Sequence, residues 1–152
     1  MSSRVLGDPL ASTLRRAART ARAPPAAVTV QTGAMMRARG KKGVSLPPGG
    51  VRISVTHLPN PHYKLDAFKR QQGIADADWP ARKRDQVKLF LRHHAEPQLR
   101  RILARASKAI KLGKPVGIVC SHGRDRSPAV AEIILEDSIA GYVRLQHNDA
   151  EE

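Results

Sequence analysis

The feature that most limits the possible folds of this chain is a short apolar run. It is followed by a polar loop and then by the start of a helix. Residues 116–119 read Val-Gly-Ile-Val between two turn signals, which is typical of a strand buried on both faces, as in a parallel sheet. Ser127 is a natural N-cap and Pro128 a natural first-turn residue for a helix that we expect to reach Ile139 and to stop at Gly141. The segment therefore predicts an α/β fold with a strand, an eight-residue loop and a helix.

The rest of the chain supplies further strands and helices of the same kind. Apolar residues recur at helical spacing after Pro97, and Gly113 suits the left-handed end of that helix. We expect a small, mostly parallel sheet flanked by helices in two or three layers, with a phosphate-binding loop between a strand and a helix. The predicted strands are 28–30, 51–55, 116–119 and 142–145, and the predicted helices are 81–95, 97–112 and 127–139.

The loop from Cys120 to Ser127 has the composition of an anion site. Gly123 permits a backbone turn that a side chain would block, so successive N–H groups can face one point beside a helix N-terminus. Arg126 can fork onto two oxygens of a phosphate, and His122 and Arg124 add donors. The loop therefore predicts a site for a phosphate group.

The same loop has the spacing of a cysteine-dependent phosphatase, with Cys120 six residues before Arg126. In that chemistry a thiolate attacks phosphorus while a carboxylic acid protonates the leaving oxygen. Asp76, Asp78 and Asp125 are the candidate acids. The alternative for Cys120 is that it is an inert residue at the strand end. The alternative for Asp76 and Asp78 is that they are ordinary acids near a helix start, and for these two acids we favour it.

The charge of the chain predicts polyanionic partners. The formal net charge is +14, which favours contact with nucleic acid, an anionic membrane surface or phosphorylated ligands. Arg101, Arg105 and Lys108 share one side of the helix after Pro97 and are candidate RNA contacts. Compositional bias and an ordinary solvated helix face remain the alternatives, and the scattered aromatic residues form no evident base-stacking platform.

Several features bear on where the protein works. Cys120 is the only cysteine, which fits a reducing compartment, and no run of about 18 apolar residues exists. We expect a cytoplasmic protein without a membrane span, although residues 1–26 read equally as an organellar targeting segment or a disordered basic tail. The histidines have no metal-ligand spacing with Cys120, so the sequence predicts no metal site and no cofactor.

Two motifs together resemble the C-terminal domain of the family of the RNase adapter protein RapZ. The first is the run Leu-Pro-Asn-Pro-His-Tyr at residues 58–63, which follows a strand as in that family. The second is the loop itself, followed by Ala131 and Glu132. The matching segments are residues 28–33, 58–63, 72–76, 119–127 and 143–147. Residues 126–128 are also similar to the loop of the low-molecular-weight tyrosine phosphatases, which we rank second.

The resemblance implies one RapZ C-terminal-like domain over residues 27–148, between a basic segment (1–26) and an acidic tail (149–152). It implies a binding module for a phosphorylated small molecule, a sugar phosphate or a nucleotide, with RNA as a further partner. We expect a free-standing relative without the family's N-terminal phosphate-binding domain. Ser54 and Thr56 stand where the family has charged residues, so the family's own amino-sugar ligand is not carried over. The resemblance implies a set of ligand-binding residues, to which the chemistry of the loop adds Arg124. The others are His62, Cys120, Ser121, His122, Gly123, Arg126 and Ser127.

Three functions stay open on the sequence. The first is the RapZ-like binding module, and the second is a cysteine-dependent phosphatase that uses Cys120 as nucleophile. The third is a nucleic-acid-binding regulator whose loop holds a backbone phosphate.

Overall fold

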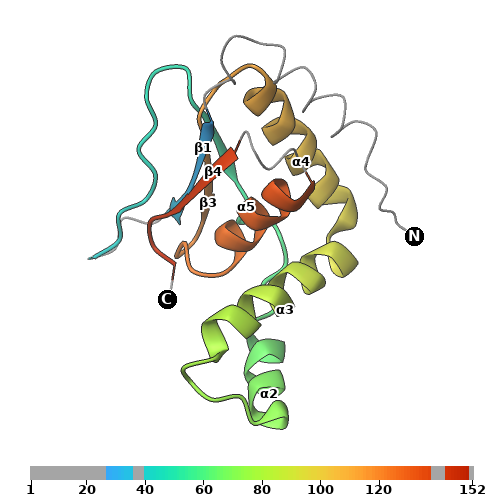
Figure 1. Ribbon diagram of the computed structural model, residues 1–152. Helices are drawn as coiled ribbons and strands as arrows, with labels where there is room; N and C mark the ends of the chain where they lie inside the picture. Colours follow the sequence, from blue (N-terminus) through green and yellow to red (C-terminus); the bar gives the residue numbers. More distant parts are fainter. Residues whose placement is uncertain (1–26, 36–39, 138–142, 151–152) are drawn as a thin grey trace, which may run out of the picture.

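The computed structural model describes residues 27–35, 40–137 and 143–150 and confirms the α/β fold (Figure 1). Four parallel strands form one sheet in the order β2-β3-β1-β4. The strands are β1 (Val28–Ala34), β2 (Val51–Ser54), β3 (Val116–Cys120) and β4 (Val143–His147). The helices are α2 (His62–Gln72), α3 (Trp79–His94), α4 (Glu96–Lys111) and α5 (Arg126–Asp137).

The helices that touch the sheet cover one of its faces. Helix α5 packs on β1, β3 and β4, and α4 packs on β2 and β3. The segment 40–50 runs along the opposite side of the sheet (Figure 1). It approaches β3 closely, because a Cβ on Gly117 would lie only 3.0 Å from Cγ2 of Val44. Of the two predicted arrangements, the described residues therefore show two layers of secondary structure.

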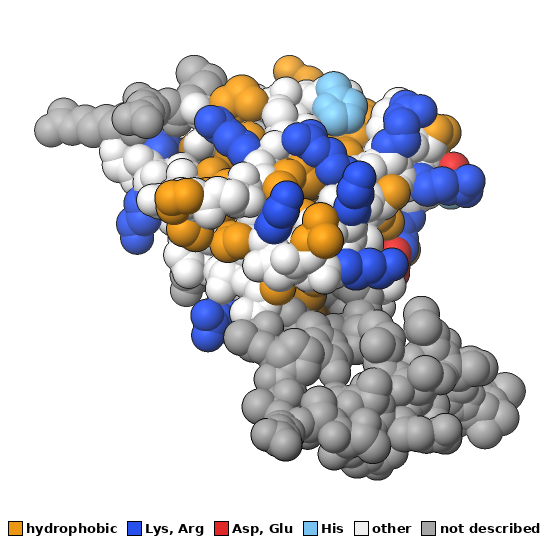
Figure 2. Space-filling model, turned by 90° about the horizontal axis from the view of Figure 1, so that it is seen from above, with side chains coloured by type: hydrophobic (Ala, Val, Ile, Leu, Met, Phe, Trp, Pro, Cys, Tyr) orange, Lys and Arg blue, Asp and Glu red, His pale blue; other side chains and the backbone are white. Residues whose placement is uncertain are grey.

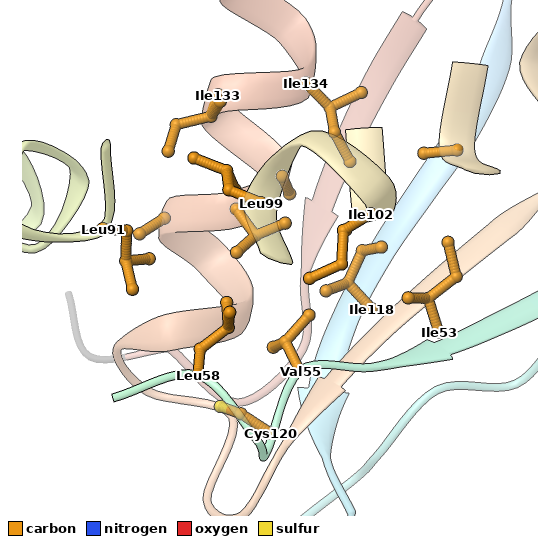
Figure 3. Packing of buried hydrophobic residues seen from close by; sticks show 14 of the residues in the cluster. Ile53, Val55, Leu58, Leu91, Leu99, Ile102, Ile118, Cys120, Ile133 and Ile134 are labelled. Carbon is orange, nitrogen blue, oxygen red and sulfur yellow. The ribbon is translucent and has the colours of Figure 1, made fainter. Parts of the chain in front are cut away.

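Strand β3 is central because it has no polar side chain to expose. All five of its residues are buried, as its apolar run predicts for a strand with neighbours on both sides. Side chains from β2, α3, α4 and α5 complete the core, and Cys120 lies at the edge of this cluster, near Leu58 and Val55 (Figure 3). The end of β3, where the loop begins, is thus anchored in the core.

Ion pairs fasten α3 to α5 along their exposed sides. Arg84 and Lys88 both pair with Glu132, and Lys88 also pairs with Glu136 at 2.6 Å. Burial raises the pKa of Glu132, but the bonds from His147, Arg84 and Lys88 outweigh it and lower this pKa to about 2. Glu132 is therefore a carboxylate at any ordinary pH, and it ties α5 to both α3 and β4.

Several elements differ from the sequence predictions. Helix α2 was not expected, and β1 extends to Ala34, where only residues 28–30 were predicted. Ser127 is not an N-cap, because α5 already begins at Arg126 and the Ser127 hydroxyl contacts the Cys120 thiol instead. The first-turn position of Pro128 is confirmed. The predicted helix end at Ile139 and the stop at Gly141 lie outside the described residues.

Asp149 binds the backbone at the carboxyl end of β1. Its carboxylate accepts the N–H groups of Ala34, Lys42 and Gly43 at 2.9, 2.7 and 2.8 Å. Burial opposes ionisation, but these bonds outweigh it and lower the pKa of Asp149. Asp149, which the sequence placed in an acidic tail, therefore joins β1 to the segment 40–50.

Candidate phosphate-binding site

The loop 121–125 lies at the carboxyl edge of the sheet, between β3 and α5, where parallel α/β sheets place ligands. The backbone N–H groups of Ser121, His122 and Gly123 make no hydrogen bond to the backbone of any described residue. Backbone N–H groups that have no acceptor and lie beside the first turn of a helix are suited to bind anions. The loop thus leaves three backbone N–H groups without a backbone acceptor among the described residues.

Gly123 is required by the backbone and by its neighbours. Its φ is 72°, in the left-handed region that favours glycine. A Cβ at this position would lie 2.6 Å from both the backbone N of Ala34 and the backbone C of Gly33. The loop therefore folds back onto the end of β1, and a side chain here would push the two apart.

Arg126 is held in place by backbone carbonyls of the segment after β2. Its side chain is 9% exposed, and Nη1 donates to the carbonyl oxygens of Thr56 and Leu58, both at 2.9 Å. Nη2 lies 3.4 Å from Oγ of Ser121. Nη1 is thus occupied by the protein itself, and Nε and the second hydrogen of Nη2 are the remaining donors of the guanidinium group.

Cys120 and Ser127 contact each other beneath the loop. The Cys120 thiol lies 3.3 Å from the Ser127 hydroxyl, and the Ser127 N–H donates to Sγ at 3.4 Å. Cys120 is only 3% exposed and Ser127 is fully buried. The sulfur thus sits under the loop at the first turn of α5, in contact with both the hydroxyl and the backbone N–H of Ser127.

A cavity of about 220 Å³ opens above this floor. Helix α2, which was not predicted from the sequence, begins at His62. This residue and the preceding Asn60 form one wall of the cavity. The first turns of α2 and α5 therefore both border the cavity, and each contributes partial positive charge. The lining residues are Asn60, His62, Cys120, His122, Arg124, Asp125 and Arg126.

The acidic residue of the loop is neutralised by α3. Asp125 pairs with Nζ of Lys83 at 2.9 Å, and both side chains are largely buried. A lone carboxylate here would repel a bound anion, but the ammonium group offsets its charge. Lys83 is a site residue that the sequence did not indicate, because it lies far from the loop in the chain.

The structure brings most of the predicted ligand-binding residues together. His62, Cys120, His122, Arg124 and Arg126 line the cavity. The other three support it: Ser121 contacts Arg126, Gly123 packs on β1, and Ser127 contacts Cys120. Asn60 is the lining residue that the sequence did not single out.

Other candidates lie elsewhere. Asp76 is exposed and pairs with Lys69, and Asp78 directly precedes α3, so neither candidate acid lines the cavity. The helix-start interpretation holds for Asp78. Among the described residues, no three His, Cys, Asp or Glu side chains are grouped as a metal ion would require.

The predicted RNA contacts form a separate surface on α4. Arg101, Arg105 and Lys108 lie outside the cavity on this helix, and Nη2 of Arg105 lies 3.3 Å from the carbonyl oxygen of Arg52. Lys and Arg side chains are frequent on the end of the molecule shown in Figure 2, where few acidic groups are visible. No helix of the described part of the chain is long and apolar enough to cross a membrane.

The sequence matches no protein-family model, and no curated protein matches it at a significant level.

Proposed function

We propose that this protein is a binding module for the phosphate group of a small molecule, as the resemblance to the RapZ C-terminal domain implies. The observation that carries the proposal is the cavity floor, where buried Arg126 lies beside the open N–H groups of the loop. Two helix N-termini and Arg124 add positive charge, and Lys83 offsets the single lining carboxylate. The phosphate of a sugar phosphate or a nucleotide is the ligand group that fits this set of donors.

The test is calorimetric titration with inorganic phosphate, sugar phosphates and nucleotides. Arg124→Gln removes a lining charge without touching the core, and we expect an affinity loss of about tenfold, as for one charge-assisted hydrogen bond. Arg101→Gln is the matched control, since it removes the same charge from α4 and leaves the cavity unchanged. Equal effects of the two variants would show that only net charge matters and would contradict the proposed site.

Arg126 needs a more careful variant because it also supports the fold. Arg126→Lys keeps one positive charge but cannot both bond the two carbonyls and present a fork. We expect this variant to lose phosphate affinity more strongly than Arg124→Gln does. Its unfolding in urea is measured in parallel, so that a loss of structure is recognised as such.

A cysteine-dependent phosphatase is the second candidate, favoured by the contacts of Ser127 with the Cys120 sulfur. The thiolate would attack phosphorus, and the leaving oxygen would take a proton from a nearby acid. Asp125 is the carboxyl group that lines the cavity, and its Oδ1 is already bound by Nζ of Lys83 at 2.9 Å. We therefore rank binding first. Hydrolysis of p-nitrophenyl phosphate that disappears in Cys120→Ser would reverse this order.

RNA is the further partner that the proposal includes. The α4 surface of Arg101, Arg105 and Lys108 is separate from the cavity, so both ligands can bind at once. Binding through phosphate groups weakens steeply with salt, and each neutralised phosphate contributes about one unit to the slope of this salt dependence. Changing all three residues to Gln should lower the slope and leave small-molecule binding intact. An unchanged slope would remove RNA from the proposal.

A further inference from the structure

The cavity is smaller than the pockets that enclose a drug-sized ligand. Its volume of about 220 Å³ lies below the roughly 300–1,000 Å³ of pockets that enclose drug-sized ligands. Its floor, with Cys120 and Arg126, is suited to the phosphate group. A part of the ligand that the cavity does not hold would extend outward, and Asn60 and His62, at the start of α2, form one of the walls beside it.

That wall carries two rings. His62 lines the cavity, and the centroid of the Tyr63 ring lies 5.8 Å from that of His62, with 70° between the ring planes. Tyr63 is 86% exposed, the highest value among the exposed large hydrophobic side chains of the described chain. The imidazole lies near a carboxylate of the same helix, with its Nε2 3.6 Å from Oδ2 of Asp66. A ligand that leaves the cavity on this side would meet the imidazole of His62, and the exposed ring of Tyr63 lies next to it.

The polar groups on the same wall are few. Oδ1 of Asn60 accepts the backbone N–H of His62 at 3.2 Å, which leaves the amide N–H₂ as the donor that a ligand can use. A sugar carries several hydroxyl groups, each of which needs a partner when water is displaced. A planar ring needs fewer polar partners, namely a stacking surface and one or two hydrogen bonds, and the Asn60 amide and the two rings of this wall can supply these.

We infer that the ligand is a phosphate monoester that carries a planar ring, as a nucleoside monophosphate does. This inference rests on the proposed phosphate site. The phosphate lies against the loop and Arg126, and the ring packs on Tyr63 and His62 with the Asn60 amide at its edge. Stacking is tolerant of the kind of ring, because every base presents a π-face.

The test compares inorganic phosphate, glucose 6-phosphate, phenyl phosphate, adenosine 5′-monophosphate and adenosine by calorimetric titration. We expect phenyl phosphate and adenosine 5′-monophosphate, the two phosphates with a planar ring, to bind about tenfold tighter than inorganic phosphate and glucose 6-phosphate, which have none, as one stacked ring contributes. Adenosine, which lacks the phosphate, should bind weakly. Adenosine binding as tight as that of its monophosphate would contradict the inference, because the phosphate would then add nothing.

Variants of Tyr63 separate stacking from folding. Tyr63→Ala should remove the advantage of the ring-bearing ligands and leave the affinity for inorganic phosphate unchanged, and Tyr63→Phe should keep the advantage. Both variants should fold, because the side chain is almost fully exposed. Leu112→Ala is the matched control, since it removes another exposed apolar side chain (62% exposed) after the end of α4.

Failure of the ring inference and failure of the phosphate site give different results. If inorganic phosphate binds but rings bring no advantage, or if Tyr63→Ala keeps that advantage, the ring inference is wrong and the phosphate site stands. If no phosphate compound binds, both are wrong.

Discussion

Replacement of Gly123 by alanine tests the geometry on which the whole site depends. The residue has a φ of 72°, and an added Cβ would meet two backbone atoms of β1 at 2.6 Å. Asp149 closes a further side, since its Cβ would lie 2.9 Å away. Backbone atoms cannot rotate out of the way as the end of a long side chain can. The loop itself must therefore move away from β1.

The expected loss of stability has two parts. The left-handed conformation costs a residue with a Cβ about 1–2 kcal/mol, and forcing an atom into a filled space costs about 1–3 kcal/mol more. Gly123→Ala should thus lower the free energy of unfolding by about 2–5 kcal/mol. Gly113 provides a matched control, because its φ is 71° and nothing lies within 4 Å of its Cβ position. Gly113→Ala should show the first part alone.

Urea denaturation of the two variants measures the difference, and phosphate titration measures its effect on the site. We expect Gly123→Ala to be less stable than Gly113→Ala and to bind phosphate weakly, while Gly113→Ala binds as the unchanged protein does. Equal losses of stability in both variants would refute the close packing of the loop on β1. Full phosphate affinity in Gly123→Ala would refute the requirement for this loop conformation.

Three further predictions concern charged groups around the site. Asp149→Ala leaves three backbone N–H groups without their acceptor and should lower the free energy of unfolding by about 1–3 kcal/mol in urea denaturation at pH 7. Because the pKa of Glu132 falls from 4.5 to about 2 on folding, its contribution is present above pH 4.5 and is lost as the pH falls toward 2. Glu132→Gln should therefore reduce this acid dependence by about 1–2 kcal/mol after allowance for solvent screening, measured as unfolding free energy against pH. Lys83→Met leaves the charge of Asp125 without this ammonium group and should weaken phosphate binding about tenfold, whereas Lys83→Arg should restore it in the same titration.

The sequence predicted the part of the site that is local in the chain. The apolar run of β3, Gly123 and Pro128 act within a short stretch, so strand, loop and helix could be recognised from their order alone. Helix α2 was missed because its apolar pattern is weak: Leu65 is its one buried residue, and the segment follows two prolines that indicated a turn. Without α2, the second wall of the cavity could not be seen.

Contacts between segments that are distant in the chain could not be predicted from the sequence. Alternation marked β4 as a strand, but it could not show that β4 pairs with β1 and so brings His147 to Thr32. From the sequence we expected the whole guanidinium group of Arg126 to be available to a ligand. In the structure its Nη1 binds two backbone carbonyls, which depends on the path of the segment after β2. Lys83 could not be recognised as a site residue, because a lysine on an amphipathic helix is ordinarily a solvated side chain.

These contacts divide the site into a fixed part and a less constrained one. The floor is fixed, because Cys120 belongs to the core, Gly123 packs on β1 and Arg126 binds the segment after β2. The wall is different: α2 packs chiefly on α3, and its Tyr63 is uncovered. A preorganised floor binds phosphate with little ordering, while a wall attached on one side can adjust to the group that follows. Substitutions on the floor should therefore change affinity for every phosphate compound, and substitutions of Tyr63 should change only the choice among them.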